Sequence, residues 1–261
     1  MNAMSRNQEE LKPKQYKTGG WSAHYILIIC TLLYIINYAD RQVFSAVLQP
    51  MKLELSLTDA QCGMAQTLFL LGMALFSFPV AYLVDRWSRK GAIAVMAVVW
   101  SGLTYITGLA TSFVGMLIPR SMVGVGESGF VAGGTAIIGA AYPKELRSRV
   151  LGIFSVATPL GAALGVMLGG MISTQYGWRM PFLVFAIPGI ILGVLALFMK
   201  DYRTAAVSAV QGEKTGFGNA ILKVISIPTL RWAYAAFGIF CFMSISVMVW
   251  LPAFIIRTLN V

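Results

Sequence analysis

Four ionisable side chains lie inside long apolar stretches of the sequence, where charge is costly. They are Asp40, Arg41, Arg120 and Glu127. A charge at the centre of a membrane helix costs on the order of 3 kcal/mol on insertion scales, so such residues usually face a cavity and carry function. The charges of the two acids and the two bases sum to zero. The chemistry available to such a set is proton uptake by a carboxylate combined with anion binding by a guanidinium.

The spacing of these residues predicts that they share helix faces. Arg120 and Glu127 are seven positions apart, which is two helical turns. Asn37 and Asp40 are three apart on an earlier segment, and Arg41 lies one turn from Asn37. One interpretation is structural, with two buried ion pairs. In the other, a carboxylate takes up a proton when an arginine leaves it for an anionic ligand. The proton must be carried by the carboxylate, because arginine itself does not deprotonate.

The glycines beside Glu127 have a competing interpretation. Residues 124–129 match G-x-G-x-x-G, a pattern that can mark a dinucleotide-binding turn, but no strand is predicted before it. Glycine within a membrane helix instead lets another backbone approach closely. We therefore expect Gly124 and Gly126 to make space in the helix, and to leave room for a substrate beside Glu127.

The composition is that of a membrane protein. Hydrophobic residues make up 57% of the chain and charged residues only 11%, against about 25% charged in a typical soluble domain. Three scattered cysteines and the single His24 leave almost no ligands for zinc. We expect no metal, no cofactor and no enzymatic activity, since neither a metal cluster nor a catalytic triad is visible.

Seven apolar segments are each near the 20 or so residues that cross a bilayer. This predicts an all-α integral membrane protein with spans at about 22–48, 60–84, 91–111, 113–142, 149–173, 181–199 and 232–256. If the N-terminus is cytoplasmic, 15 of the 20 Lys and Arg residues lie on the inside and 3 outside. The positive-inside rule thus predicts this orientation and explains the net charge of +10 without nucleic acid. We expect the membrane to be a bacterial inner membrane.

One inside loop places an acid before three bases: Asp85, Arg86, Arg89 and Lys90. At the end of a helix, such a group can form ion pairs with neighbouring helix ends. We expect Asp85 to pair with Arg147 or Arg149, forming a cytoplasmic gate that latches one conformation.

Several motifs together resemble the major facilitator superfamily. The stretch 81–90 is similar to its loop signature G-x-x-x-D-R-x-G-R-K, although Ala81 and Ser88 replace glycines. The stretch 120–126 is similar to the family's fourth-helix motif, and G-W-R-x-x-F at 177–182 to a common loop. The family's fifth-helix motif is matched by Pro159, Gly161, Gly165 and Gly169. We expect these residues to pack against other helices.

Within that superfamily, N-Y-A-D-R at 37–41, G-V-G-E at 124–127 and W-L-P-A-F at 250–254 resemble the spinster family. The resemblance implies proton coupling at Asp40 and Glu127. It implies a substrate cavity lined by Asn37, Tyr38, Arg41, Arg120, Gly124 and Gly126. The anion:cation symporters share a similar N-Y-x-D-R and carry organic anions such as sugar acids, so they remain an alternative.

The resemblance also implies the organisation of the chain. Superfamily members have two six-helix halves. We expect a cytoplasmic tail at 1–21, a six-helix bundle of two inverted three-helix repeats at 22–200, a cytoplasmic linker at 201–231, and the seventh helix at 232–261. A C-terminal half is then the expected partner, together with lipid, protons and a small-molecule or lipid substrate.

The expected function is proton-coupled secondary transport of an amphiphilic lipid or organic anion by alternating access. A non-transporting seven-helix protein is a distant alternative. A retinal protein needs a lysine in the last helix, and 232–256 contains none.

Overall fold

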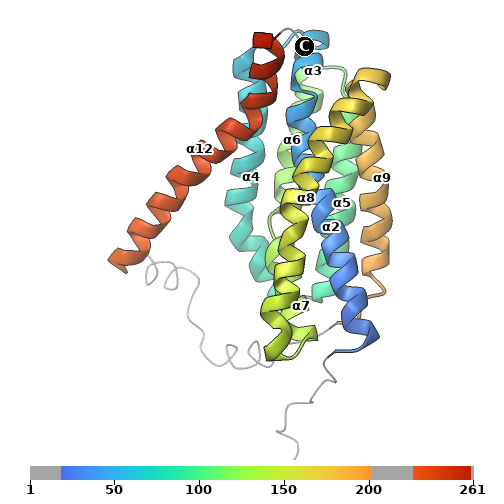
Figure 1. The fold of residues 1–261 in the computed structure, drawn as a ribbon, viewed down its shortest axis with the longest axis vertical. Helices are drawn as coiled ribbons and strands as arrows, with labels where there is room; N and C mark the ends of the chain where they lie inside the picture. The colour runs from blue at the N-terminus through green and yellow to red at the C-terminus, as the bar shows by residue number, and fades with distance from the viewer. Residues whose placement is uncertain (1–18, 202–225, 260–261) are drawn as a thin grey trace, which may run out of the picture.

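The apolar segments of the sequence become long α-helices in the computed structural model, which describes residues 19–201 and 226–259. Most of these long helices lie side by side in one bundle, and the last helix diverges from it (Figure 1). The described chain is helical and contains no strand, so the predicted all-α membrane fold is confirmed. The helices are α2 (Trp21–Ala46), α3 (Leu48–Glu54), α4 (Asp59–Arg86), α5 (Arg89–Gly108), α6 (Phe113–Glu127), α7 (Phe130–Ala141), α8 (Lys144–Tyr176), α9 (Arg179–Ala196) and α12 (Pro228–Leu259).

Seven spans among the described residues are long and apolar enough to cross a membrane, and α6 and α7 together form one of them. The chain runs back and forth between two ends of the bundle (Figure 1). We call the end where α2 begins the proximal end, and the end that carries α3 the distal end. The predicted tail at 1–18 and most of the predicted linker, 202–225, lie outside the described residues.

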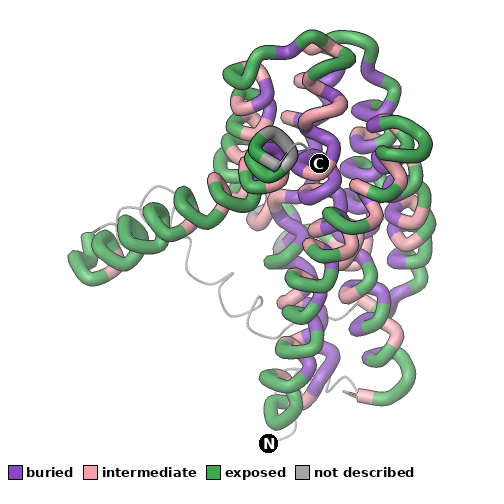
Figure 2. The backbone as a smooth tube through the Cα atoms, turned by 45° about the horizontal axis from the view of Figure 1, so that its top comes forward, coloured by how far each residue is buried: buried purple, intermediate pink, exposed green. Residues whose placement is uncertain are grey.

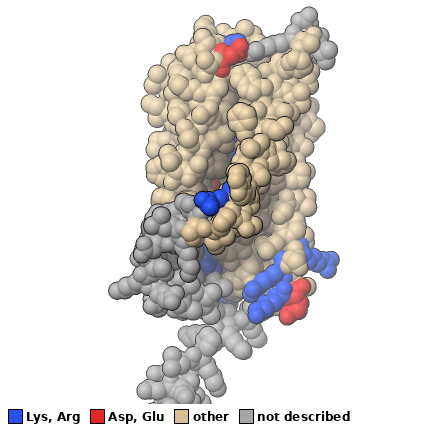
Figure 3. All heavy atoms as spheres, turned by 90° about the vertical axis from the view of Figure 1, so that its left-hand side faces the viewer, with Lys and Arg blue, Asp and Glu red and all other residues tan. Residues whose placement is uncertain are grey.

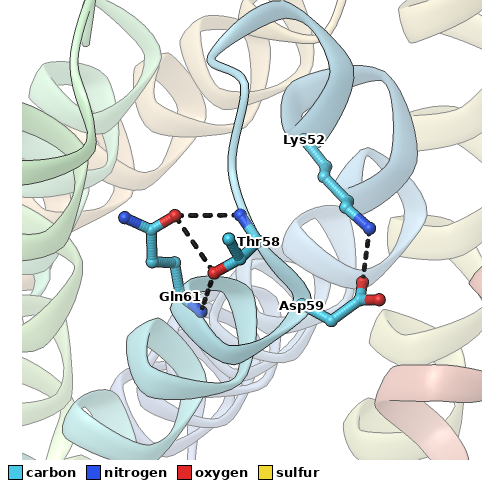
Figure 4. A network of polar contacts seen from close by, with 4 residues as sticks. All are labelled: Lys52, Thr58, Asp59 and Gln61. Carbon is cyan, nitrogen blue, oxygen red and sulfur yellow. Dashed lines mark hydrogen bonds and ion pairs between the residues drawn. The ribbon is translucent and has the colours of Figure 1, made fainter.

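Side-chain caps define where several helices begin. Thr58 and Gln61 form a reciprocal capping box at the start of α4, in which Gln61 N donates to Thr58 Oγ1 (3.2 Å) and Thr58 N to Gln61 Oε1 (2.8 Å). Beside it, Lys52 Nζ lies 2.7 Å from Asp59 Oδ1, as Figure 4 shows. These groups satisfy N–H donors that the first helical turn leaves free, and they orient the short α3 against α4.

Glycines bring α8 against α2. A Cβ atom built on Gly161 would lie 2.4 Å from the carbonyl oxygen of Ile35, and one on Gly165 would lie 2.5 Å from that of Ala39. Gly169 continues the same face, 3.4 Å from the Cβ of Ala46. Only glycine fits at the first two positions, so the spacing of four sets how closely α8 approaches the helix that carries Asp40.

The fourth membrane segment is interrupted in its middle. The predicted span at 113–142 is observed as one span, Phe113–Ala141, in which α6 ends at Glu127 and α7 begins at Phe130. The hydroxyl of Ser128 donates to the carbonyl of Val125 (2.7 Å), and Gly129 sits where a Cβ would lie 2.4 Å from the side chain of Val80. The backbone therefore changes its hydrogen-bonding pattern directly after the buried Glu127.

The last helix, α12, touches the bundle at its distal end only. Gln42 Nε2 donates to Met248 Sδ (3.0 Å), and Ala253 is buried. Toward the start of α12 the side chains are exposed, with Trp232 at 78%. Figure 2 shows this helix exposed over most of its length, in contrast to the buried inner faces of the bundle.

Candidate functional site

The four predicted charges meet in the interior of the bundle. Asp40 and Arg41 come from α2, and Arg120 and Glu127 from α6. Asp40, Arg120 and Glu127 are each at most 1% exposed, and all four groups are close enough to influence one another electrostatically. In the view of Figure 3, most other charged atoms lie at the two ends of the molecule.

One direct ion pair forms within this cluster. Arg41 Nε lies 2.7 Å from Glu127 Oε2, and the two side chains are 17% and 0% exposed. The Arg41 guanidinium also lies over the Tyr38 ring at 4.8 Å, and Asn37 is within reach of the same carboxylate. The second oxygen of Glu127, Oε1, has no hydrogen-bond partner. Glu127 is thus only partly satisfied, although it is buried.

Asp40 makes a weaker set of contacts. The hydroxyl of Thr104, on α5, donates to Asp40 Oδ2 at 3.4 Å, and Oδ1 has no partner. The sequence reasoning missed Thr104. The available signal was a polar residue in the apolar stretch 91–111, which is common in membrane helices and so does not identify one position.

Arg120 is held by aromatic rings. Its guanidinium lies 4.7 Å from the ring centre of Phe44 and 4.6 Å from that of Phe69, while Nε and Nη2 have no hydrogen-bond partner. Among the described side chains, Arg120 and Asp40 do not approach to ion-pair distance. The structural interpretation of two buried ion pairs therefore fits Arg41 with Glu127, and it does not fit the other two charges.

The two glycines that we expected to line the cavity lie at close helix contacts, and their role toward a substrate stays a prediction. A Cβ on Gly124 would lie 2.1 Å from the carbonyl oxygen of Phe69 on α4, and one on Gly126 would lie 3.3 Å from Trp100 on α5. Neighbouring helices already occupy the space that the missing side chains leave. The glycines therefore bring helices together beside Glu127.

The predicted cytoplasmic gate lies at the proximal end. Arg89 is buried and donates to the carbonyl of Ala136 (3.5 Å), and Arg147 Nε donates to the carbonyl of Tyr142 (3.2 Å). Lys90 is half-buried and Arg149 is exposed. The side chains of Asp85 and Arg86 lie outside the described residues, so the latch between Asp85 and Arg147 or Arg149 stays a prediction.

A second polar cluster, which we did not predict, joins three helix ends at the distal end. Glu54 accepts hydrogen bonds from Arg179 Nη1 and from Trp178 Nε1 (2.9 Å), and Arg179 Nη2 donates to the carbonyl of Ala110 (3.0 Å). The Arg179 guanidinium stacks over the Trp178 ring at 4.4 Å. The hydrogen bond from Arg179 lowers the pKa of Glu54 below its ordinary value. The motif at 177–179 was visible in the sequence, but its partner is 125 residues away.

No group of three or more His, Cys, Asp or Glu in the described part of the chain could hold a metal ion. The central site is built from carboxylates, guanidinium groups and aromatic rings. Together with seven apolar spans, these features define a polytopic α-helical membrane protein with a buried, charge-balanced centre.

The chain belongs to the Major Facilitator Superfamily, whose family model matches residues 30–261. Members of this family are transporters and not enzymes. A hexuronate transporter of Bacillus subtilis is 28% identical over 88% of this chain and 56% of its own length. Protein spinster of Drosophila melanogaster is 26% identical over 93% of this chain and 40% of its own.

A structural comparison agrees with this assignment. A bacterial homologue of the human lysosomal transporter Spinster, in an inward-facing and unoccupied conformation, superimposes with a TM-score of 0.79 at 27% identity. The match covers 93% of this chain and 57% of that protein. The chain spans about half the length of the curated relatives it matches.

Proposed function

We propose that this chain supplies one half of a proton-coupled secondary transporter, which moves an amphiphilic lipid or organic anion by alternating access. The observation that carries the proposal is the buried cluster of two carboxylates and two arginines, in which only Arg41 and Glu127 pair directly. A cluster with unused donors and acceptors can exchange protons and ligand without first breaking a complete network.

The coupling follows from charge. When Glu127 takes up a proton it loses its attraction for Arg41, and the charge-assisted hydrogen bond at 2.7 Å weakens. Arg41 and Arg120 then present two positive charges to an anionic group, with Asp40 as the second protonation site. Release of the substrate returns Arg41 to the carboxylate and favours loss of the proton. Proton and substrate are thereby linked through one shared charge.

We consider two substrate classes. The resemblance to spinster proteins noted in the sequence implies an amphiphilic lipid, and similarity to a hexuronate transporter favours a sugar acid. Both classes include members with a carboxylate or phosphate group, which the arginines would bind. An organic-anion symporter is therefore the second candidate function.

Alternating access needs a second half to close against this one. The side chains of α12 that face away from the bundle are large, apolar and exposed, among them Trp232, Phe237, Phe240 and Phe242. We propose that α12 is the first helix of a C-terminal half, and that the other five helices of that half cover part of this face within the bilayer. The N-terminus and the linker at 201–231 then lie in the cytoplasm, and the distal end faces outward.

Uptake into proteoliposomes tests the proton site in the transporter completed by its second half. Glucuronate and a lysophosphatidate serve as probes for the two substrate classes. We expect Glu127→Gln and Asp40→Asn each to abolish uptake driven by a pH gradient, while substrate binding survives in at least one of them. Glu145→Gln, an exposed acid at the proximal end, is the matched control and should transport normally. If both site variants retain gradient-driven uptake, the cluster holds helices together and is not a proton site.

A further inference from the structure

Arg120 is buried beside two carboxylates and yet pairs with neither. We propose that Phe44 and Phe69 form an aromatic clamp, which holds the Arg120 guanidinium away from Asp40 and Glu127 and keeps it available for the anionic group of the substrate. The two phenylalanines are then positioning residues that act through Arg120. The inference rests on the proposed function, and it adds residues that determine whether the site recognises an anion.

The geometry of the clamp comes from three helices. Phe44 lies on α2, Phe69 on α4 and Arg120 on α6, and all three side chains are at most 1% exposed. The ring centres lie 4.7 and 4.6 Å from the guanidinium carbon. A cation within about 6 Å of an aromatic face is attracted to it, and more strongly when water is excluded. Two rings can therefore hold a buried guanidinium in place without a carboxylate.

The unused donors of Arg120 point to a ligand. A buried guanidinium normally has its N–H groups satisfied, because leaving them unpaired in the interior is costly. Here Nε and Nη2 have no partner, although Asp40 and Glu127 are near enough to interact with the charge. An arginine that served packing alone would gain by reaching one of them. The planar fork of donors matches a carboxylate or phosphate, which is the group we assign to this position.

Phe69 also lies near the second arginine, Arg41. Its ring centre lies 5.8 Å from the Arg41 guanidinium, so one ring contacts both cations, while only Arg41 reaches Glu127. The position of Phe69 is set by the close helix contact at Gly124, whose Cβ would lie 2.1 Å from the Phe69 carbonyl oxygen. Gly124 therefore contributes indirectly, by registering α4 against α6 so that the ring reaches Arg120.

The test compares Phe69→Leu and Phe44→Leu with Phe69→Tyr, which keeps the ring, and with Phe154→Leu. Phe154 is equally buried but stacks on Tyr34 and is not among the rings around Arg120, so it controls for lost packing. In the full-length transporter we expect the two clamp variants to raise KM roughly tenfold for the anionic probe that it accepts, glucuronate or a lysophosphatidate. KM for the corresponding neutral ester should not change. Phe69→Tyr should restore KM, and Phe154→Leu should leave the preference for the anion intact.

A structure of the Phe69→Leu variant provides a readout that needs no substrate. We expect Arg120 to move into ion-pair distance of Asp40 or Glu127 once the ring is gone. The clamp is refuted if Arg120 stays in place without a partner, or if the anion and its neutral ester lose affinity equally. Failure of the proton proposal would be seen separately, in unchanged pH-driven uptake by Glu127→Gln and Asp40→Asn.

Discussion

At the scale of single residues, the buried charges are less completely paired than their balance suggests. Two acids and two bases could form two ion pairs, but Arg41 with Glu127 is the only pair that forms among them. A fully paired buried network would resist protonation, because each partner stabilises the charged form of the other. Partial pairing leaves one oxygen each of Asp40 and Glu127, and two nitrogens of Arg120, without a hydrogen-bond partner, as the proposed exchange of proton and anion requires.

The distal cluster around Glu54 offers a pH-dependent test outside the membrane. Because the hydrogen bond from Arg179 lowers the pKa of Glu54, the ionised carboxylate stabilises the folded state at pH values above the ordinary pKa of 4.5. This contribution disappears as the pH falls through the lowered value. We expect the Tm of the wild-type protein in detergent to exceed that of Glu54→Gln at about pH 7, and the difference to shrink as the pH is lowered below the ordinary pKa of 4.5.

The matched control for this prediction is Glu145→Gln, which removes another exposed carboxylate, at the opposite end of the bundle. Its Tm should follow that of the wild-type protein over the same pH range. A difference between Glu54→Gln and the wild type that persists at low pH would mean that shape, and not charge, matters at position 54.

At the scale of elements, glycine spacing controls which helices meet at the site. The face of α8 that carries Gly161 and Gly165 lies directly on the backbone of α2, so the helix with Asp40 and Arg41 is fixed from behind. On α6, Gly124 and Gly126 do the same against α4 and α5. Close backbone contact is how membrane helices gain packing energy where the lipid is as apolar as their side chains.

Gly165→Leu should damage this arrangement. Its Cβ would lie 2.5 Å from the Ala39 carbonyl oxygen, so α8 and α2 must separate. Overpacking of this kind costs about 1–3 kcal/mol where side chains can adjust, and a backbone oxygen adjusts less than a side chain. We expect a lower Tm and less monodisperse protein by size-exclusion chromatography in detergent.

Gly170→Leu and Gly152→Leu are controls on the same helix, since a Cβ at either position meets nothing within 4 Å. Both variants should behave like the wild-type protein. If all three substitutions lower the Tm alike, the effect comes from glycine in α8 generally, and the α2–α8 contact is not its cause.

At the scale of the whole molecule, the two ends of the bundle differ in charge. The basic side chains at the starts of α5 and α8 lie at the proximal end, which the positive-inside rule assigns to the cytoplasm. The distal end carries the paired groups Lys52 with Asp59 and Arg179 with Glu54. This asymmetry predicts an orientation in the membrane, and the prediction can be tested without knowledge of the substrate.

The orientation predicts thiol labelling in intact cells. In a background without Cys30, Cys62 and Cys241, we expect a membrane-impermeant maleimide to label Ala60→Cys at the distal end and not Ser148→Cys at the proximal end. Both positions are exposed, so access and not burial decides the result. Ser148→Cys should become reactive when the cells are permeabilised. Labelling of Ser148→Cys from outside in intact cells would reverse the proposed topology.

The sequence by itself determined the class of the protein and the positions of its spans. A run of about 20 apolar residues crosses a bilayer as an α-helix. The bilayer core offers no water, and in a helix the backbone N–H and C=O groups form hydrogen bonds within the same segment. The four charges could also be recognised in the sequence, because a charged side chain within a membrane span is energetically costly and therefore rare. Caps such as Thr58 with Gln61 are also local, since their partners are three residues apart.

Only the tertiary structure decided how those residues meet. The partner of Glu127 is 86 positions away, and that of Glu54 is 125 positions away, so no local pattern could name them. The sequence could not show that neighbouring helices occupy the space beside Gly124 and Gly126. A missing side chain leaves room for a ligand as well as for another backbone, and the sequence does not distinguish the two. Which of these occupies the space depends on how α4, α5 and α6 cross. Their crossing geometry is determined by many weak contacts spread along the chain.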